Sequence, residues 1–434
     1  MKKSLIFGEP DYFKNIRSRI IPFITSRVVP FAGFTLITVM IARLNYPELG
    51  TFTYLTAMFS LPVVLMSMPL AMVGNFSAAS KKTGESGSEI FLSGLPLAVI
   101  LSVSGGFIAA FMLFYLVNTV DPNVDLAGRI YCFCVPFLII NTYLFYYIES
   151  YISNKIMAKV KIASTFISAV AILSLSVFVN EIVTWHVFSV FLLIEIILFC
   201  LYVWVTVSHS DANLRQGIGL KITEASKKLI VIGLPVALGL TGQKAVYFLI
   251  TQRINDINSS LVADLSVMMS ISGILSLPFA AFAQIHSLFV SENDFKFHYQ
   301  IYKQGVVCGC IAIFSILILG VGSYYFLLEL YNAAPDLYSI NYFVSISALF
   351  VASSLMLLSM SHLRALHDTL YPQSIAVLIL LAGFIPVIWL HTFKSNALYK
   401  VIYIQAAFTM IIFVALSFRI KTQFKFSNGT EVTQ

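Results

Sequence analysis

Long apolar stretches alternate with short polar loops along the whole chain. Each stretch holds about 20 predominantly apolar residues, the length that an α-helix needs to cross a bilayer at about 1.5 Å per residue. Twelve such spans are predicted, over residues 20–43, 51–77, 90–117, 128–148, 162–180, 186–208, 229–251, 262–290, 305–328, 338–361, 373–392 and 397–418. The pattern predicts an all-α, polytopic membrane protein with twelve transmembrane helices.

The two halves of the chain resemble each other. Pro69 in the second span corresponds to Pro278 in the eighth, and Pro22 at the start of the first corresponds to Pro235 in the seventh. Each half holds six spans, an even number, so both halves begin on the same side of the membrane. This is the arrangement of a parallel repeat, whose axis lies along the membrane normal.

The longest polar segment lies between the halves and defines three expected parts. We expect an N-terminal six-helix lobe at 1–208, a cytoplasmic linker at 209–228, and a C-terminal six-helix lobe with a short cytoplasmic tail at 229–434.

Composition and charge agree with a chain solvated by lipid. Hydrophobic residues make up 59% and charged residues 11% of the chain, against about 25% charged residues in a soluble domain. With the N-terminus inside, twenty of the 27 Lys and Arg residues fall in cytoplasmic segments and five outside, while Arg27 and Lys244 lie within spans. The positive-inside rule then predicts a multi-pass protein of the bacterial inner membrane with both termini in the cytoplasm.

This distribution makes the net charge of +7 a topology signal, so we expect no nucleic-acid partner. The N-terminus shows no removable signal peptide, and the first span is expected to act as the targeting signal. The partners that remain are the bilayer and a transported molecule, and a monomer is expected.

The chain offers little for chemistry outside the membrane. The five cysteines lie in or beside apolar spans, where packing is expected rather than a metal site or a disulfide. The longest loop has no nucleophile–base arrangement, and no Gly-rich loop is present to hold a phosphate. We therefore expect neither an enzyme nor a cofactor. A duplicated bundle with prolines inside its helices suits alternating access better than a channel.

Two motifs are similar to those of a known transporter family. Residues 363–373, LRALHDTLYPQ, resemble the loop after the tenth span of the multidrug and toxic compound extrusion (MATE) family, and residues 233–248 resemble its seventh span. The proline-centred second and eighth spans fit as well. The resemblance implies two six-helix lobes around a central cleft, and export of small organic molecules coupled to a cation, either proton or sodium.

The chain departs from that family at three positions where relatives often carry carboxylates. Here the corresponding residues are Ile37 or Thr38, Gln243 and Ser353. Residues 41–57, IARLNYPELGTFTYLTA, are instead similar to the first outer loop of polysaccharide flippases, a second branch of the superfamily. Two functions therefore stay open: small-molecule export by antiport, and, as the alternative, flipping of a lipid-linked oligosaccharide.

Three charged residues lie deep within predicted spans, where a charge costs at least about 2.5 kcal/mol. They are Arg27, Glu195 and Lys244. Three interpretations stay open for them. The long cationic side chains can extend to an interface, Glu195 can pair with one of the cations, or the residues handle the substrate or the coupling ion. Two cations against one carboxylate would favour an anionic ligand.

Several further polar residues are candidates with weaker arguments. Gln243 can hydrogen-bond a ligand or a neighbouring helix, and Tyr247, one turn later, can stack on a ligand or pack. His286, His362 and His367 are expected at a surface or an interface, since no metal-ligand arrangement accompanies them. Arg364 and Asp368 are four residues apart and are expected to pair.

Overall fold

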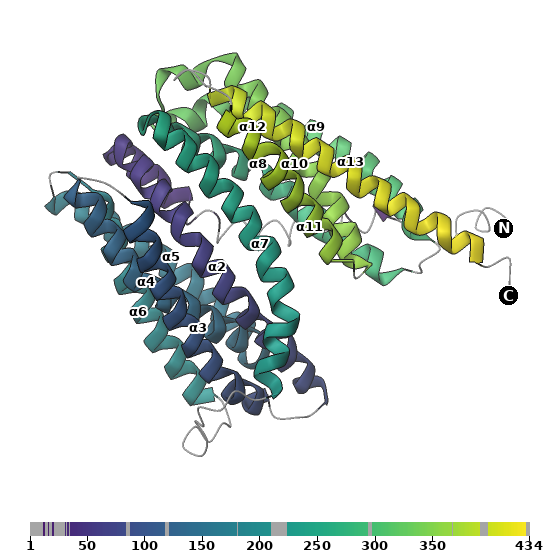
Figure 1. The fold of residues 1–434 in the computed structure, drawn as a ribbon, viewed down its shortest axis with the longest axis horizontal. Helices are drawn as coiled ribbons and strands as arrows, with labels where there is room; N and C mark the ends of the chain where they lie inside the picture. The colour runs from purple at the N-terminus through teal and green to yellow at the C-terminus, as the bar shows by residue number, and fades with distance from the viewer. Residues whose placement is uncertain are drawn as a thin grey trace. The chain divides into compact units, whose positions relative to one another are not determined.

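The structure, a computed structural model, is helical throughout the residues that it describes. These are 35–83, 87–117, 121–179, 181–209, 224–293, 297–366, 368–390 and 398–430, with the single positions 12, 13, 16, 20, 31 and 33. Eleven helices in this part are long and apolar enough to cross a membrane (Figure 1). The prediction of an all-α, multi-pass membrane protein is confirmed. The predicted first span lies mostly outside the described residues, and its last part forms the helix Thr35–Leu44.

The helices follow one another with short connections. They are α2 (Tyr46–Thr83), α3 (Gly87–Leu116), α4 (Pro122–Tyr147), α5 (Asn154–Phe178), α6 (Thr184–His209), α7 (Glu224–Ile257), α8 (Ser260–Glu292), α9 (His298–Leu330), α10 (Ile340–Ala365), α11 (Leu370–Leu378), α12 (Ile385–Leu390) and α13 (Leu398–Thr430). The π-helical turn η1 (Ile148–Ile152) continues α4, η4 (Ile379–Phe384) joins α11 to α12, and the 3₁₀ turn η3 (Pro335–Tyr338) precedes α10. Many helices exceed the predicted spans because their polar end turns stay helical beyond the apolar stretch.

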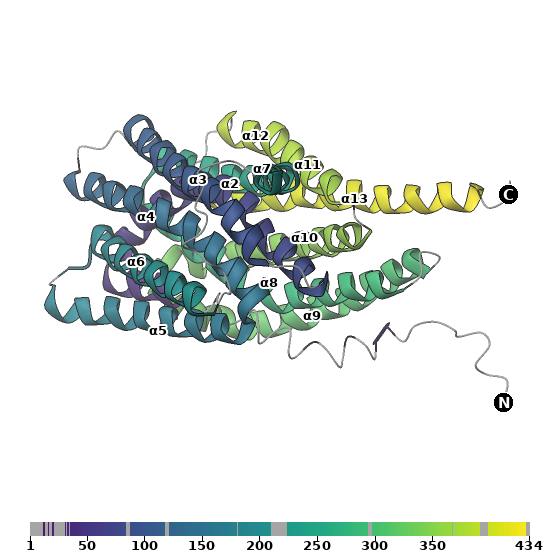
Figure 2. The ribbon, with the colours of Figure 1, turned by 90° about the horizontal axis from the view of Figure 1, so that it is seen from below.

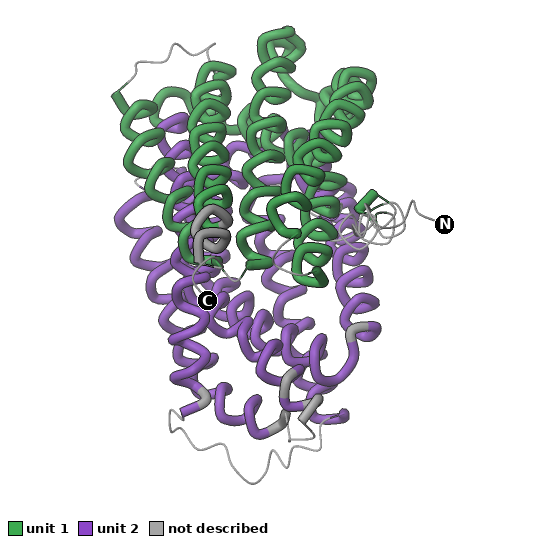
Figure 3. Tube along the Cα trace, turned by 90° about the vertical axis from the view of Figure 1, so that its right-hand side faces the viewer, with its two compact units in different colours: residues 1–32, 256–434 green, residues 33–255 purple. Residues whose placement is uncertain are grey.

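Packing divides the chain into two compact units (Figure 3). Unit 1 comprises Met1–Ala32 and Asp256–Gln434, and unit 2 comprises Gly33–Asn255. Unit 2 therefore holds α2 to α7 and unit 1 holds α8 to α13. The predicted lobes follow the sequence duplication instead, and their boundaries at 1–208, 209–228 and 229–434 stay a prediction.

Unit 2 is built around α4, which packs most closely on α6 and also on α2 and α3 (Figure 2). Its core is rich in aromatic rings. Tyr131 of α4 stacks on Phe59 of α2 with ring centroids 4.9 Å apart, and meets Phe188 of α6 edge-on at 4.6 Å. Offset-stacked and edge-to-face pairs of this kind each contribute about 0.5–1.5 kcal/mol beyond burial. The α4–α6 contact is thus the most extensive helix contact in the unit, and aromatic pairs stabilise it.

The start of α6 is held by the segment before and within the first turn of α2. The Asn45 side chain donates to the Ile182 carbonyl at 3.2 Å. The Thr184 backbone N–H donates to the Glu48 carboxylate at 2.7 Å, and the Thr184 hydroxyl donates to the same oxygen. A carboxylate beside exposed N–H groups is stabilised by the dipole at a helix N-terminus. Asn45 and Glu48 therefore have a structural role.

Unit 1 is built around α10, which packs on α13 and α8. At one end, Asp368 accepts hydrogen bonds from the Arg419 Nε at 3.1 Å and from the Gln423 side chain at 2.9 Å. The Arg419 guanidinium also lies over the Tyr371 ring, 4.9 Å from its centroid. The expected pair of Asp368 with Arg364 is wrong, because the carboxylate points to α13 and bonds Arg419 instead.

A close backbone approach in unit 2 joins α7 to α2. A Cβ placed on Gly233 would lie 2.5 Å from the Pro69 Cα and 3.1 Å from the Pro69 carbonyl oxygen. Both are backbone atoms, which cannot rotate aside as a side chain can. Small residues allow membrane helices to approach in this way, so Gly233 is required by the closeness of the two backbones.

We expect Gly233→Ala to destabilise the protein by about 1–3 kcal/mol or more, the usual cost of overpacking. The measurement is the thermal unfolding midpoint of the detergent-solubilised protein, which is monitored by size-exclusion chromatography. Gly322→Ala in α9 is the control, since a Cβ there meets nothing within 4 Å, and loss of helix-interior glycine is neutral or mildly stabilising. An equal midpoint for both variants would contradict the assignment.

Candidate functional site

A polar pair lies between α4 and α6 in unit 2. The Asn141 side-chain amide donates to the Glu195 carboxylate at 2.7 Å and to the Glu195 backbone oxygen at 2.9 Å. Asn141 is only 5% exposed. The two residues occupy facing positions on α4 and α6, so the amide is placed by the packing of one helix on the other.

The surroundings of this pair are mainly aromatic. Tyr131, Cys134 and Tyr202 lie within electrostatic range of the Glu195 carboxylate. The Cys134 thiol donates to the Phe188 carbonyl at 3.8 Å, so it does not bond the carboxylate. Lys161 of α5 is the cation that acts on Glu195. In surroundings of low dielectric constant, a change of charge on this carboxylate strongly changes its electrostatic interaction with neighbouring groups.

The Asn141–Glu195 pair has one hydrogen-bond acceptor that is not used. The Asn141 Oδ1 is buried and has no hydrogen-bond partner among the described residues. A buried amide oxygen without a donor costs free energy, and such sites in native proteins often serve a ligand, an ion or water. Amide and carboxylate oxygens accept from N–H and O–H groups and suit a proton or a small hard cation.

The described part of the chain holds no group of three or more His, Cys, Asp or Glu side chains arranged to hold a metal ion. The chemistry of the pair is therefore that of one carboxylate and one amide.

The structure tests the expected partners of Glu195 in part. Lys244, on α7 in the same unit, is exposed, and no ion pair joins it to Glu195 among the described residues. Glu195 is instead satisfied by Asn141, a neutral donor that the sequence did not single out. Arg27 lies outside the described residues. The hypothesis of a buried Glu195–Lys244 pair is thus wrong for this structure, because the lysine side chain leaves the packed interior.

The other candidates on α7 lie on one face of that helix. Gln243 and Tyr247 are half-buried and one turn apart. The next residue, Phe248, is buried against Tyr54 of α2 with ring centroids 6.0 Å apart. The side of α7 that carries Phe248 therefore packs, while a ligand role for Gln243, Lys244 and Tyr247 stays a prediction.

Unit 1 contains buried polar residues, including two histidines that were predicted to lie at a surface or an interface. His286 and His362 are fully buried, although a surface or interface position was expected. The reason is that α10 continues through His362 to Ala365, so that residue belongs to the helix rather than to a loop. Asp264, at the first turns of α8, is 8% exposed. His367 lies outside the described residues.

Comparison with known proteins identifies the fold. No protein-family model matches the chain, and neither does any curated protein sequence. Solved transporter structures match nearly its whole length. An inward-facing multidrug resistance MATE family transporter of the MOP superfamily is 11% identical, with a TM-score of 0.75 over 94% of this chain and 96% of that chain.

Two further structures agree. A MOP superfamily transporter from Pyrococcus furiosus Vc1, described as having a binding pocket of reverse polarity that suggests a different function, is 12% identical, with a TM-score of 0.67 over 96% of each chain. A MATE protein in the bent conformation is 13% identical, with a TM-score of 0.63 over 98% of each chain. The chain therefore has the MATE-type transporter fold, as the motifs predict.

We expect Asn141→Leu to destabilise the protein by about 1–3 kcal/mol, because the half-buried Glu195 carboxylate would lose its donor. The thermal unfolding midpoint in detergent measures the effect. Thr142→Val, on the next position of α4, is the matched control, since that hydroxyl bonds only the Leu138 carbonyl of its own helix at 2.8 Å. If the two variants unfold at the same temperature, the Asn141–Glu195 bond does not support the packing.

Proposed function

We propose that this protein is a secondary transporter that exports a small organic molecule across the inner membrane by alternating access, as a cation-coupled antiporter. The MATE-type fold supports this class of function, and the Asn141–Glu195 pair is the observation that carries the coupling. Glu195 is a titratable carboxylate at a helix contact, and its partner Asn141 has a buried oxygen to offer a donor.

The proposed coupling step is a change of charge at Glu195. When the carboxylate is ionised, the Asn141 amide donates to it at 2.7 Å. When a proton binds, the charge disappears and the attraction of Lys161 is lost. A sodium ion would act similarly, held by the carboxylate and the amide oxygen. In either case the α4–α6 contact responds to the coupling cation, because both partners of the pair lie in that contact.

The proposed substrate is anionic or polar and uncharged rather than cationic. The three positions where related transporters often carry carboxylates are Ile37 or Thr38, Gln243 and Ser353. Ile37 and Thr38 are buried, and Gln243 cannot titrate. Gln243 and Tyr247 would bind the polar part of the substrate, with Lys244 supplying positive charge. A binding pocket of reverse polarity is described for the Pyrococcus transporter.

Flipping of a lipid-linked oligosaccharide is the alternative function, which the similarity of residues 41–57 to a flippase loop suggested. In this structure, Asn45 and Glu48 of that segment hold the start of α6. The similarity therefore has a structural explanation in this fold, and it does not favour the flippase. Small-molecule export remains the better supported proposal.

The proposed orientation places both termini and the 209–228 linker in the cytoplasm. Impermeant maleimide applied to intact cells should label Asn255→Cys and spare Gln216→Cys, each in a background without native cysteines. Labelling of both positions after the cells are permeabilised confirms that each thiol can react. The reverse pattern, with only position 216 labelled in intact cells, would show that the charge distribution has been misread.

We expect Glu195→Gln to lower proton-driven transport by about ten-fold or more, since glutamine keeps the hydrogen bond to Asn141 but cannot change charge. The assay is uptake of lucifer yellow, an organic anion, by proteoliposomes under an imposed pH gradient. Ethidium serves as the cationic comparison.

Glu149→Gln, the same change at the half-buried carboxylate of η1, is the control and should transport normally. Undiminished proton-driven uptake by Glu195→Gln would place the coupling site elsewhere. Movement of a lipid-linked oligosaccharide but of neither dye would favour the flippase.

A further inference from the structure

A groove of about 290 Å³ lies between α5 and α6 of unit 2. The two helices lie side by side (Figure 2), but α6 packs mainly on α4 and leaves a space beside α5. The α6 side of the groove comes from Ile194, Ile197, Leu198 and Leu201. These positions are three and four residues apart, and the lining positions on α5 have the same spacing. The groove is therefore bounded by one face of each helix.

The groove opens onto the surface of the unit. Ile194 is 8% exposed and forms the floor, whereas Ile167 and Ile197 at the edges are 55% and 53% exposed. Ala163, on the α5 side, is exposed, and its methyl group is too small to fill the space between the helices. In a protein that crosses a membrane, an exposed apolar groove of this kind faces the hydrocarbon chains of lipid.

One end of the groove is positively charged. Lys159 lines this end, and Lys155 lies one turn before it on the same face of α5. Both lysines are exposed, and neither forms an ion pair with a carboxylate in the part of the chain that the structure describes. The dipole of α5, which begins at Asn154, adds partial positive charge at the same end.

The rest of the groove is apolar. Apart from Lys159, Ser164 is the one polar side chain among the described lining residues, and its hydroxyl donates to the Lys161 carbonyl at 3.0 Å. The eight residues from Lys159 to Ile167 extend about 12 Å along the helix. One leaflet of a bilayer has a hydrocarbon depth of about 15 Å, half of the whole core. The groove therefore matches an acyl chain in both length and polarity.

Trp204 indicates the depth of the charged end in the membrane. It lies one turn beyond Leu201 on the same face of α6 and is 62% exposed. Because α5 and α6 run in opposite directions, Trp204 lies toward the end of the groove that carries the lysines. Tryptophan is enriched where the hydrocarbon core meets the headgroups, and basic pockets between membrane helices at this level bind anionic headgroups.

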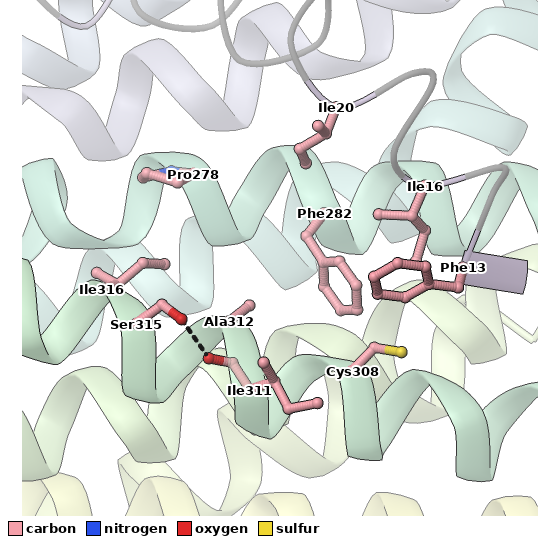
Figure 4. A pocket seen from close by; sticks show the side chains of 10 residues that line it. All are labelled: Phe13, Ile16, Ile20, Pro278, Phe282, Cys308, Ile311, Ala312, Ser315 and Ile316. Carbon is pink, nitrogen blue, oxygen red and sulfur yellow. Dashed lines mark hydrogen bonds between the residues drawn. The ribbon is translucent and has the colours of Figure 1, made fainter.

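A second cavity, in unit 1, provides a comparison within the same protein. It has about 300 Å³ and lies over α8 and α9 (Figure 4). None of the ten labelled side chains around it is charged, and the Ser315 hydroxyl is used by the Ile311 carbonyl at 2.9 Å. That cavity offers space for an apolar group but no charge for a headgroup. The α5–α6 groove combines the two features.

We propose that the groove between α5 and α6 binds an anionic phospholipid of the bilayer, with one acyl chain along the groove and the headgroup phosphate at Lys155 and Lys159. The proposal requires only that the chain crosses a membrane, and it does not depend on the transported substrate, on Glu195 or on the orientation of the protein. A lipid bound here fills the space between the two helices, so it stabilises the folded protein by mass action.

Native mass spectrometry of the full-length protein in detergent tests the proposal. The probes are dioleoyl phosphatidylglycerol and dioleoyl phosphatidylcholine, which share their acyl chains and differ in the charge of the headgroup. We expect phosphatidylglycerol to bind more tightly by about five-fold for each of the two lysines, or about 25-fold in total. Equal binding of the two lipids overturns the proposal.

Charge variants test the position of the headgroup. The double change Lys155→Gln and Lys159→Gln should remove the preference for phosphatidylglycerol. The double change Lys227→Gln and Lys228→Gln removes the same charge from exposed positions in the first turns of α7 and should leave the preference intact. A preference that survives the first change, or that disappears with the second, shows that the headgroup binds elsewhere and contradicts the assignment.

A change in the groove itself tests the position of the acyl chain. Ala163→Leu fills the groove and keeps both lysines, so the affinity for phosphatidylglycerol should fall about five-fold or more, the lower end of the usual cost of overpacking. Ala110→Leu, at an exposed position of α3, is the matched control and should bind normally. The rise in the thermal unfolding midpoint on addition of phosphatidylglycerol should be lost only in Ala163→Leu. Unchanged binding by Ala163→Leu, or an equal loss in Ala110→Leu, overturns the proposal.

Discussion

A buried polar group in a lipid-solvated bundle must find its partner within the protein, because the bilayer core offers no hydrogen bonds. The positions of the helices reflect this constraint at several points. The Tyr143 hydroxyl bonds the Phe91 carbonyl at 2.5 Å, and Ser226 bonds the Ser93 carbonyl at 2.6 Å, tying α4 and α7 to α3. The Asn141 amide and the Glu195 carboxylate satisfy the same need between α4 and α6.

The fold could be predicted from the sequence much further than the site could. Each apolar stretch has the length of a membrane-spanning helix, and a helix satisfies its backbone hydrogen bonds within its own segment. Eleven of the twelve predicted spans correspond to long helices in the described part of the chain, and the first lies mostly outside it. The pairing of Asn141 with Glu195 depends on the relative height of two helices, which hydropathy does not contain. The Asp368–Arg419 bond joins residues 51 apart, so the local spacing to Arg364 pointed to the wrong partner.

The burial of His286 could not be predicted from the sequence for a related reason. His286 lies within an apolar stretch, but its burial depends on Gly305 of another helix, which leaves space for the ring. A single sequence shows both residues and does not show that they meet. Close approaches of this kind are tertiary information, as is the contact of Gly233 with Pro69.

The π-helical turn η4 has a consequence for how the eleventh predicted span meets its neighbours. Ala376 in α11 is buried, and so are Phe384 and Ile388 further along. In an uninterrupted α-helix, Phe384 and Ile388 would lie about 80° and about 120° around the axis from Ala376. One residue absorbed in the wider turn brings each to within about 20° of it. The wider turn thus shifts the phase of the apolar stripe, and α11 and α12 present one continuous buried face from a sequence whose periodicity is broken.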